Sequence, residues 1–475
     1  MSLFRTKAIN TDLMSGSGLK RVLGAFDLTL LGIGAIIGAG IFVLTGIAAA
    51  VQSGPALVLS FIIAGIACAC AALSYAELAA SVGGAGSAYG YSYAGLGELP
   101  AWIIGWMLIL EYTVSVSAVS VGWSGYVNNA LQAIGYGLPD FLMHGPFDKL
   151  HPGGLINLPA ALIIVTLGTL LVIGAKVSAR FNSIMVVIKL IAIAIFIGVA
   201  SFHVDPANWH PFIPPMTTDA DGVNHFGYQG VMAGAAMIFF AYIGFDAVST
   251  AAEETRNPQR DLPIGIIGSL LICTILYIVV SALLTGIVHY DKLNVPSPVA
   301  FAMLQIHQNW AAGIISIGAI AGLTTVMLVL YYALTRVFFA IARDGLLPQF
   351  FSKVNAGSGS PVRCIVLTGI VIFFLAGFVP LGNLVEVTNI GTLGAFCVVC
   401  AGVVMLRRTR PELPRPFKTP FSPLIPVLGI GFSLWLMTYL QKETWEAFAI
   451  WLTAGLLIYF GYSRSHSELA QPAQE

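Results

Sequence analysis

Apolar stretches of about 20 residues, separated by short polar segments, run through most of this 475-residue chain. A helix needs about 20 apolar residues to cross the hydrocarbon core of a bilayer. The pattern therefore predicts an all-α integral membrane protein with twelve transmembrane helices. We place them near residues 26–51, 55–78, 99–126, 157–175, 181–202, 228–252, 263–288, 309–335, 362–380, 384–406, 424–440 and 445–462.

Two of these stretches are interrupted by glycine. Residues 32–42 have the sequence GIGAIIGAGIF, and residues 239–246 have the sequence FFAYIGFD. Unwound backbone at membrane depth is tolerated only where it is buried in protein or lines a cavity. Broken helices at corresponding places in two halves of a chain are typical of the binding site of a secondary transporter. The pattern therefore predicts a membrane protein that moves a small solute.

The interrupted stretches are the first and the sixth of the twelve, so the first ten spans divide into two halves of five. Because each half has an odd number of spans, any similarity between the halves is an inverted repeat. We expect a cytoplasmic tail over 1–25, a core over 26–406, two further spans over 407–462 and a cytoplasmic tail over 463–475. No linker in the sequence separates a second domain.

Charge agrees with a membrane setting and indicates the orientation. Hydrophobic residues make up 57% of the chain and charged residues 9%, against roughly 25% in soluble proteins. With both termini cytoplasmic, 18 Lys and Arg residues lie on the inner side and three on the outer side, as the positive-inside rule requires. We expect a multi-pass protein of the cell membrane, surrounded by lipid. The zero net charge gives no reason to expect nucleic acid as a partner.

The positions of the cysteines and histidines give no indication of a catalytic site or of a bound metal ion. The six cysteines lie in or beside predicted spans, where such residues are usually small buried apolar groups. Seven of the eight histidines fall in or beside predicted outer loops. We find no metalloprotease, serine-hydrolase or phosphate-binding motif. The sequence therefore predicts no enzyme, no cofactor and no metal ligand.

The first interruption has the chemistry of an anion site. Gly38, Ala39 and Gly40 follow Ile36 and Ile37 and leave backbone N–H groups beside a helix terminus. The partial positive charge of that terminus favours a carboxylate, and the absence of bulky side chains lets it approach. These five residues form the predicted carboxylate-binding half of the site.

The second interruption has the complementary chemistry. Carbonyl groups freed around Phe240, Ala241 and Ile243 can accept hydrogen bonds from an α-ammonium group. The alternative is that the glycines only allow close helix packing. That alternative suits the Gly34–Gly38 pair, but it does not explain two glycine clusters at matched places. Phe240 is either a lid over the solute or a packing residue.

The same motifs resemble a known family. Two further motifs accompany the glycine clusters GIGAIIGAGIF and FFAYIGFD. They are AEETRNPQRDLP at residues 252–263 and RDGLLP at residues 343–348. Together they are similar to the amino acid–polyamine–organocation superfamily, specifically its cationic amino acid transporter family and bacterial relatives, over about residues 20–460. The resemblance implies a LeuT-like 5+5 inverted repeat with broken helices 1 and 6, alternating access, and L-amino acids as substrates.

Two ionisable residues lie near the predicted midplane, Glu111 in the third span and Lys189 in the fifth. A charge at the centre of a membrane helix costs about 2.5–3.5 kcal/mol, so each residue needs a partner or a function. In the resembled fold the fifth helix faces the first break, where sodium-coupled relatives hold a cation. The Lys189 ammonium would replace that cation, which predicts coupling to protons. Alternatively, Lys189 only ties two helices together, and Glu111 either contacts substrate or joins helices.

Substrate choice depends on a position in the eighth span. In the resembled family the position of Leu330 borders the substrate side chain, and an apolar residue there offers nothing to a guanidinium. We therefore expect symport of neutral L-amino acids with protons. A carrier of Arg and Lys, an exchanger and a receptor that binds amino acids without moving them remain alternatives. The oligomeric state stays open.

Overall fold

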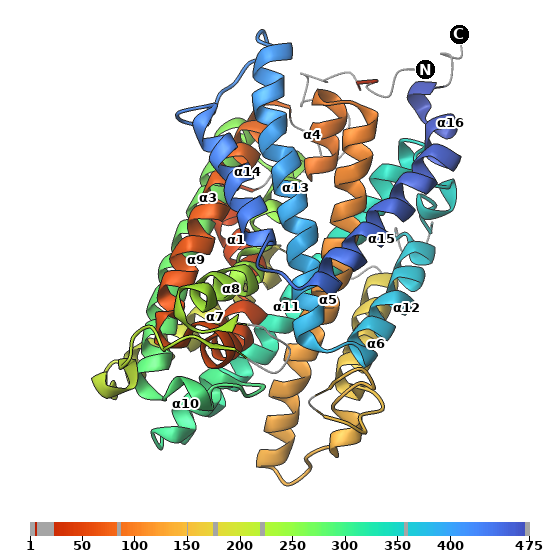
Figure 1. Cartoon of the computed structure of the whole chain (residues 1–475). Coiled ribbons are helices and arrows are strands. Elements are labelled where there is room, and N and C mark those ends of the chain that lie inside the picture. Colours follow the sequence, from red (N-terminus) through yellow and green to blue (C-terminus); the bar gives the residue numbers. More distant parts are fainter. Residues whose placement is uncertain are drawn as a thin grey trace.

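Long helices that run roughly side by side make up nearly the whole molecule (Figure 1). The computed structural model describes residues 5–6, 23–82, 87–149, 151–173, 179–218, 224–355 and 360–470. Most of the predicted N-terminal tail, 1–25, lies outside these residues.

The described part of the chain contains eight helical stretches that are long and apolar enough to cross a membrane. They are Gly40–Ser81, Glu98–Ala133, Ser183–Ala200, Gly227–Ser249, Pro258–Ile287, Asn309–Arg343, Leu381–Thr409 and Lys442–His466. Four shorter apolar helices accompany them, namely Ala25–Ile36, Leu158–Ile173, Val362–Phe378 and Leu424–Met437. Every stretch that the hydropathy pattern selects is therefore helical over most of its length.

The individual elements follow in chain order. The α-helices are α1 (Ala25–Ile36), α2 (Thr45–Ala48), α3 (Leu57–Ser81), α4 (Ser87–Gly95), α5 (Glu98–Ala133), α6 (Leu158–Ile173), α7 (Ala179–Ala200), α8 (Gly227–Ile238), α9 (Pro258–Ile287), α10 (Pro298–Gln305), α11 (Asn309–Arg343), α12 (Val362–Phe378), α13 (Leu381–Thr409), α14 (Leu424–Met437), α15 (Lys442–Ile458) and α16 (Arg464–His466). Two-residue strands β1 (Thr217–Thr218) and β2 (Asn224–His225) pair antiparallel, with Thr217 opposite His225.

Short 3₁₀ and π segments connect or extend these helices. The π segments are Gly40–Leu44, Ala49–Ser53 and Tyr459–Ser463, and the 3₁₀ segments are Gly54–Ala56, Asp140–Leu142, Pro206–Trp209, Phe239–Tyr242, Phe245–Glu254, Tyr290–Lys292, Gln349–Phe351 and Glu468–Ala470. Such departures from α-helix often occur at functional positions.

The bundle has two ends, which we name by the helices there. The α16 face carries α4 and α16, and the α10 face carries α10 and the connection between α5 and α6 (Figure 1). Helix α5 packs against α11, α13, α6 and α12, while α1 packs against α9 and α7. Large apolar side chains are exposed on α6, α7, α9, α12, α14 and α15. An apolar outer surface of this extent is typical of a protein in contact with lipid.

Two helix ends differ from the hydropathy prediction. Helix α5 continues to Ala133 and ends where Gly135 is left-handed, with φ +85°, and the Tyr136 amide donates to the Leu131 carbonyl at 2.9 Å. At the other end of the chain, helix continues to His466, inside the segment predicted as a C-terminal tail. Polar residues at these positions shorten the apolar stretch without ending the helix, so hydropathy alone places the ends too early.

Candidate functional site

The first predicted interruption is a break in the helix. Helix α1 ends at Ile36. The Ile37 amide still donates to the Ile33 carbonyl at 3.0 Å, but Ile37 itself is extended, with φ −73° and ψ 103°. Helix resumes as the π segment that begins at Gly40. Amide groups in the first turn of a helix have no partner within that helix. Here the Phe42 amide donates to the Gly38 carbonyl at 3.2 Å, and the amides before it belong to the first turn of the new helix.

The second predicted interruption is also a break. Helix α8 passes into the 3₁₀ turn Phe239–Tyr242, and the chain then extends at Ile243 before a second 3₁₀ segment begins at Phe245. Gly244 lies between them with φ +117°, in the left-handed region that favours glycine. A Cβ atom here would also lie 2.9 Å from the carbonyl carbon of Ala35.

The two breaks lie against each other. A Cβ atom added to Gly40 would lie 2.3 Å from the Cβ of Ala241, far inside van der Waals contact. The contact of Gly244 with Ala35 gives a second approach between the same segments. Glycine is thus required where the breaks meet, because any larger residue at these positions would clash with the other break.

Tyr277 of α9 connects the two breaks. Its hydroxyl oxygen lies 2.9 Å from the Ile36 carbonyl oxygen and 2.7 Å from the Ala241 carbonyl oxygen. The Phe240 carbonyl accepts from the Ile243 amide at 3.2 Å. Two of the carbonyls predicted to bind an ammonium therefore already have a partner in the chain, although each oxygen keeps a second lone pair. Sequence reasoning missed Tyr277; a buried phenol in an apolar helix, which needs a polar partner, was the available signal.

Lys189 of α7 reaches the first break. Its Nζ donates to the Gly34 carbonyl at 2.7 Å and to the Ile37 carbonyl at 3.0 Å, and the side chain is fully buried. Gly322 of α11 makes room for the lysine stem, since a Cβ atom there would lie 2.9 Å from Lys189 Cγ. The ammonium thus occupies the space beside the unwound end of α1.

Glu111 lies near the second break, beside Asp246. The side chain is 1% exposed, and its neighbours include Asp246 and Thr392. Its Oε1 has no hydrogen-bond partner among the described residues. Asp246, in the 3₁₀ segment after the second break, accepts a hydrogen bond from the Tyr112 hydroxyl at 2.7 Å. The two carboxyl groups form a buried acidic pair behind the second break.

Helix α11 and helix α13 complete the surroundings. Val326 packs against the first break, with its Cγ2 3.2 Å from the Cβ position of Gly38, and Leu330 follows one turn later and is 2% exposed. Asn389 of α13 donates to the Ala236 carbonyl at 2.7 Å, at the end of α8. Val326 and Asn389 could not be selected from the sequence, because their contacts depend on which helices become neighbours.

Both breaks are closed off from solvent in this conformation. None of Ile36, Ile37, Ala39, Phe240, Ala241 and Ile243 is more than 6% exposed. On the α10 face lies a cavity of about 470 Å³, whose lining includes Val43, beyond the first break, and Gly122. On the other side Leu23 bridges to Thr255, and the Arg256 amide donates to the Leu23 carbonyl at 2.9 Å.

Comparison with known proteins places this chain in a family. Residues 23–460 match the family described as amino acid permease. The chain belongs to the amino acid permease family. The predicted resemblance to the amino acid–polyamine–organocation superfamily is thereby confirmed, and this permease is a membrane transport protein and not an enzyme.

Relatives match this permease over almost its whole length. It is 51% identical over 474 residues to a branched-chain amino acid permease of Bacillus subtilis, covering 99% of both chains. It is 49% identical over 470 residues to a methylthioribose transporter of the same organism, covering 98% of this chain and 99% of the relative. A vacuolar cationic amino acid transporter of Arabidopsis thaliana is 39% identical over 415 residues, which cover 86% of this chain and 68% of the relative.

Proposed function

We propose that this permease imports neutral L-amino acids, with aliphatic side chains preferred, by alternating access and in symport with protons. In this proposal α1 with the Gly40–Ser53 segment, and α8 with the segment after it, are broken helices 1 and 6 of a twelve-span LeuT-like fold. The first ten spans form the 5+5 inverted repeat, and the α16 face is cytoplasmic.

The observation that carries the proposal is the contact between the two breaks. A helix start at Gly40 presents amide groups and a partial positive charge, which suit an α-carboxylate. Carbonyl oxygens of the second break, at Phe240, Ala241 and Ile243, suit an α-ammonium. One bound amino acid would satisfy both sets, because its two charged groups are attached to the same carbon atom.

The side chains around the breaks support neutral substrates. Phe240, Ile243, Val326 and Leu330 are buried and apolar. An aliphatic substrate side chain would gain free energy from such surroundings, whereas a guanidinium would lose its hydration without a partner. The relative named as a branched-chain amino acid permease agrees with this preference. Cationic amino acids remain an alternative because Glu111 lies nearby and a relative is named as a cationic amino acid transporter.

A thioether sugar is a second candidate substrate. The relative named as a methylthioribose transporter is almost as similar as the branched-chain permease. Methylthioribose has an apolar methylthio group but no carboxylate or ammonium, so it would use hydroxyl groups. The Glu111 Oε1 atom, which is buried and has no hydrogen-bond partner in the described part of the chain, is an acceptor that such a hydroxyl could satisfy.

The surroundings of Lys189 support proton coupling. As an ammonium, Lys189 makes two charge-assisted hydrogen bonds that hold the unwound end of α1 against α7. Loss of the proton would weaken both bonds and let α1 shift. Protonation then biases the open and closed states, provided that those states bind the proton unequally.

Uptake into proteoliposomes tests the proposal. Purified permease should concentrate radiolabelled leucine or valine when the external pH is lower than the internal pH, whether sodium or potassium is the bulk cation. Excess alanine, isoleucine or valine should compete far better than arginine, lysine or methylthioribose. Stronger competition by arginine and lysine, or by methylthioribose, would assign the substrate to the corresponding alternative. Saturable binding without flux would indicate a receptor, and strict sodium dependence would contradict proton coupling.

A further inference from the structure

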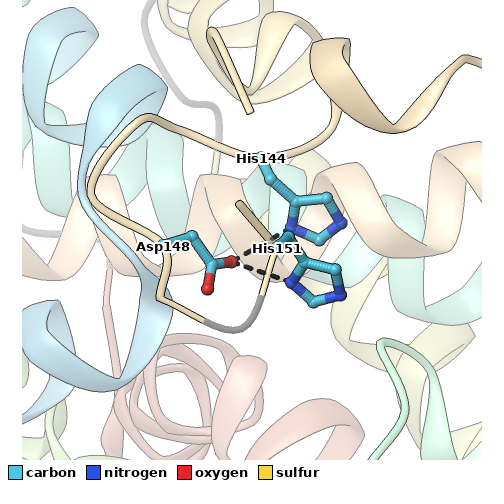
Figure 2. A group of neighbouring side chains, drawn as sticks. All are labelled: His144, Asp148 and His151. Carbon is cyan, nitrogen blue, oxygen red and sulfur yellow. Dashed lines mark hydrogen bonds and ion pairs between the residues drawn. The ribbon is translucent and has the colours of Figure 1, made fainter. Parts of the chain in front are cut away.

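Two histidines and one aspartate converge in the connection between α5 and α6, on the α10 face (Figure 2). The Nδ1 atoms of His144 and His151 each lie 3.1 Å from the same oxygen, Oδ2 of Asp148. The two imidazole rings are stacked, with centroids 3.6 Å apart and planes within 10°. One ligand atom from each of the three residues lies within 4.8 Å of the others.

We propose that His144, Asp148 and His151 form a binding site for a divalent transition metal, with Zn²⁺ as the cation that fits best. Zinc is bound by imidazole nitrogen and carboxylate oxygen at about 2.0–2.2 Å, in tetrahedral sites. Ligand atoms of such a site lie roughly 3.3 Å apart, close to the two Nδ1–Oδ2 distances of 3.1 Å. Because the two rings are stacked, one imidazole must turn so that both nitrogens point at the same ion. Ca²⁺ and Mg²⁺ prefer oxygen ligands, which makes two imidazoles a poor site for them.

The connection holds the three residues in place before any metal binds. The Asp148 amide donates to the Gly145 carbonyl at 3.2 Å, and the His151 amide donates to the Asp148 carbonyl at 3.3 Å, so consecutive turns set the ligand spacing. A Cβ atom on Gly145 would lie 2.3 Å from the Phe378 carbonyl oxygen. The loop backbone that carries the three residues is therefore packed directly on the end of α12.

A metal ion can reach these residues from solution. The side chains of His144, Asp148 and His151 are 25%, 16% and 49% exposed, respectively. All three line the cavity of about 470 Å³ on the α10 face. Three protein ligands with an open direction leave the fourth position to water, as zinc sites with an accessible metal do.

The position of the site links metal binding to transport. The same cavity is lined by Val43, beyond the first break, by Gly122 of α5 and by Leu381 at the start of α13. A metal that fixes the connection would fix one wall of a cavity that must open and close in alternating access. Zinc is therefore expected to slow uptake; this consequence depends on the proposed function, whereas the binding site does not.

Zinc binding to the purified full-length protein tests the site directly. The protein is prepared without a polyhistidine tag, because the tag would itself bind zinc. Zn²⁺ is then titrated in competition with a zinc-sensitive dye. We expect one zinc ion per chain. The dissociation constant should rise at least about tenfold in both His144→Asn and His151→Asn, because losing even a residue that only supports a ligand weakens metal binding by about 10–100-fold. The matched control is His289→Asn. The Nδ1 atom of His289 lies 2.7 Å from Asp291, so this pair also combines a histidine with an aspartate but contains one imidazole and not two.

Equal zinc affinity in wild type and both variants would overturn the site, as would an equal loss in the control. X-ray absorption of zinc bound to the wild-type protein keeps the test valid if a variant fails to fold. Nitrogen and oxygen neighbours with imidazole scattering are expected, whereas a sulfur shell would place the zinc on cysteines and refute the proposal.

Uptake then tests the consequence. Zn²⁺ but not Mg²⁺ should lower wild-type uptake, a chelator should restore it, and His144→Asn should be insensitive. Zinc binding without an effect on uptake would refute the link to transport but would still support the binding site. Absence of any uptake would instead refute the proposed function, since dye competition measures binding without substrate.

Discussion

The two helix breaks meet in the middle of the bundle, yet they are held by different groups. A buried ammonium, Lys189, donates to carbonyls on either side of the residues where α1 unwinds. After the second break, Asp246 accepts from the neutral hydroxyl of Tyr112, and Gly244 supplies a left-handed backbone. The Tyr277 hydroxyl lies within hydrogen-bond distance of a carbonyl of each break.

This difference suggests a division of tasks. The contacts at the first break depend on a group whose charge can change, so that break can respond to protons. The second break depends on backbone geometry and on the hydrogen bond from the Tyr112 hydroxyl to the Asp246 carboxyl, and the hydroxyl keeps its proton over the physiological range of pH. We therefore expect variants at the first break to change coupling, and variants at the second break to change the rate without changing coupling.

The largest effect is expected where the breaks touch. Gly40→Ala places a methyl group 2.3 Å from the Cβ of Ala241 and forces the breaks apart. Uptake of valine should fall more than about tenfold, with a stability cost of roughly 1–3 kcal/mol for overpacking. Initial uptake rates and thermal unfolding in detergent measure the two effects. Gly431→Ala is the control, since no atom lies within 4 Å of its Cβ position; wild-type uptake by Gly40→Ala would show that the breaks are not in contact.

The next largest effect is expected from Lys189→Met, which keeps an unbranched stem and removes the charge. Stimulation of uptake by an inward proton gradient should disappear, because no protonated group then holds α1 against α7. Uptake with and without a gradient, at the same external pH, gives the ratio. Lys292→Met, in an exposed turn, should keep the wild-type ratio. Persistent stimulation in Lys189→Met would mean that the lysine is only structural.

A smaller effect is expected from Tyr112→Phe, which removes the hydrogen bond to Asp246. Loss of a donor to a buried carboxyl costs about 1.5–3 kcal/mol if that group is charged, so the second break should be less ordered. Uptake should fall several-fold while stimulation by the proton gradient keeps its wild-type ratio. Tyr136→Phe, at an exposed loop position, controls for loss of a phenol. A changed ratio in Tyr112→Phe would remove the distinction between the two breaks.

The smallest effect is expected from Leu330→Ala, which should alter selectivity more than rate. A larger pocket beside the first break should let phenylalanine compete several-fold better relative to valine, since one methylene in such a pocket is worth about 1–3 kcal/mol. Competition against labelled valine measures the change. Ile317→Ala, on an exposed part of α11, should leave the competition series unchanged. An unchanged series for Leu330→Ala would place Leu330 outside the substrate pocket.

Much of the fold was predictable because a bilayer imposes a simple rule. Each apolar stretch of sufficient length is helical, and the two glycine clusters are breaks. The ends of α5 and of the last helical stretch were placed too early, because polar residues interrupt the apolar stretch while the helix continues, and hydropathy does not detect the turn at Gly135 that ends α5. The inverted repeat and the domain boundaries stay predictions.

The candidate site was predictable in part. Residues of the breaks themselves were selected because glycine in an apolar helix is a local signal. Lys189 was selected because a charge in an apolar helix is also a local signal. Tyr277, Val326 and Asn389 were missed, since tyrosine, valine and asparagine acquire a role only through the carbonyls or glycines that other helices bring beside them.

By itself the sequence determined that this protein is a helical membrane permease, that two helices break, and that Lys189 needs a partner. These conclusions follow because the hydrocarbon core of a bilayer contains no water that could hydrogen-bond backbone groups or solvate a charge. Only the tertiary structure decided that the breaks touch at Gly40 and Ala241, that Lys189 bonds the first one, and that His144, Asp148 and His151 converge. Contacts between residues distant in the chain depend on helix packing and loop geometry, which no local pattern of hydrophobicity contains.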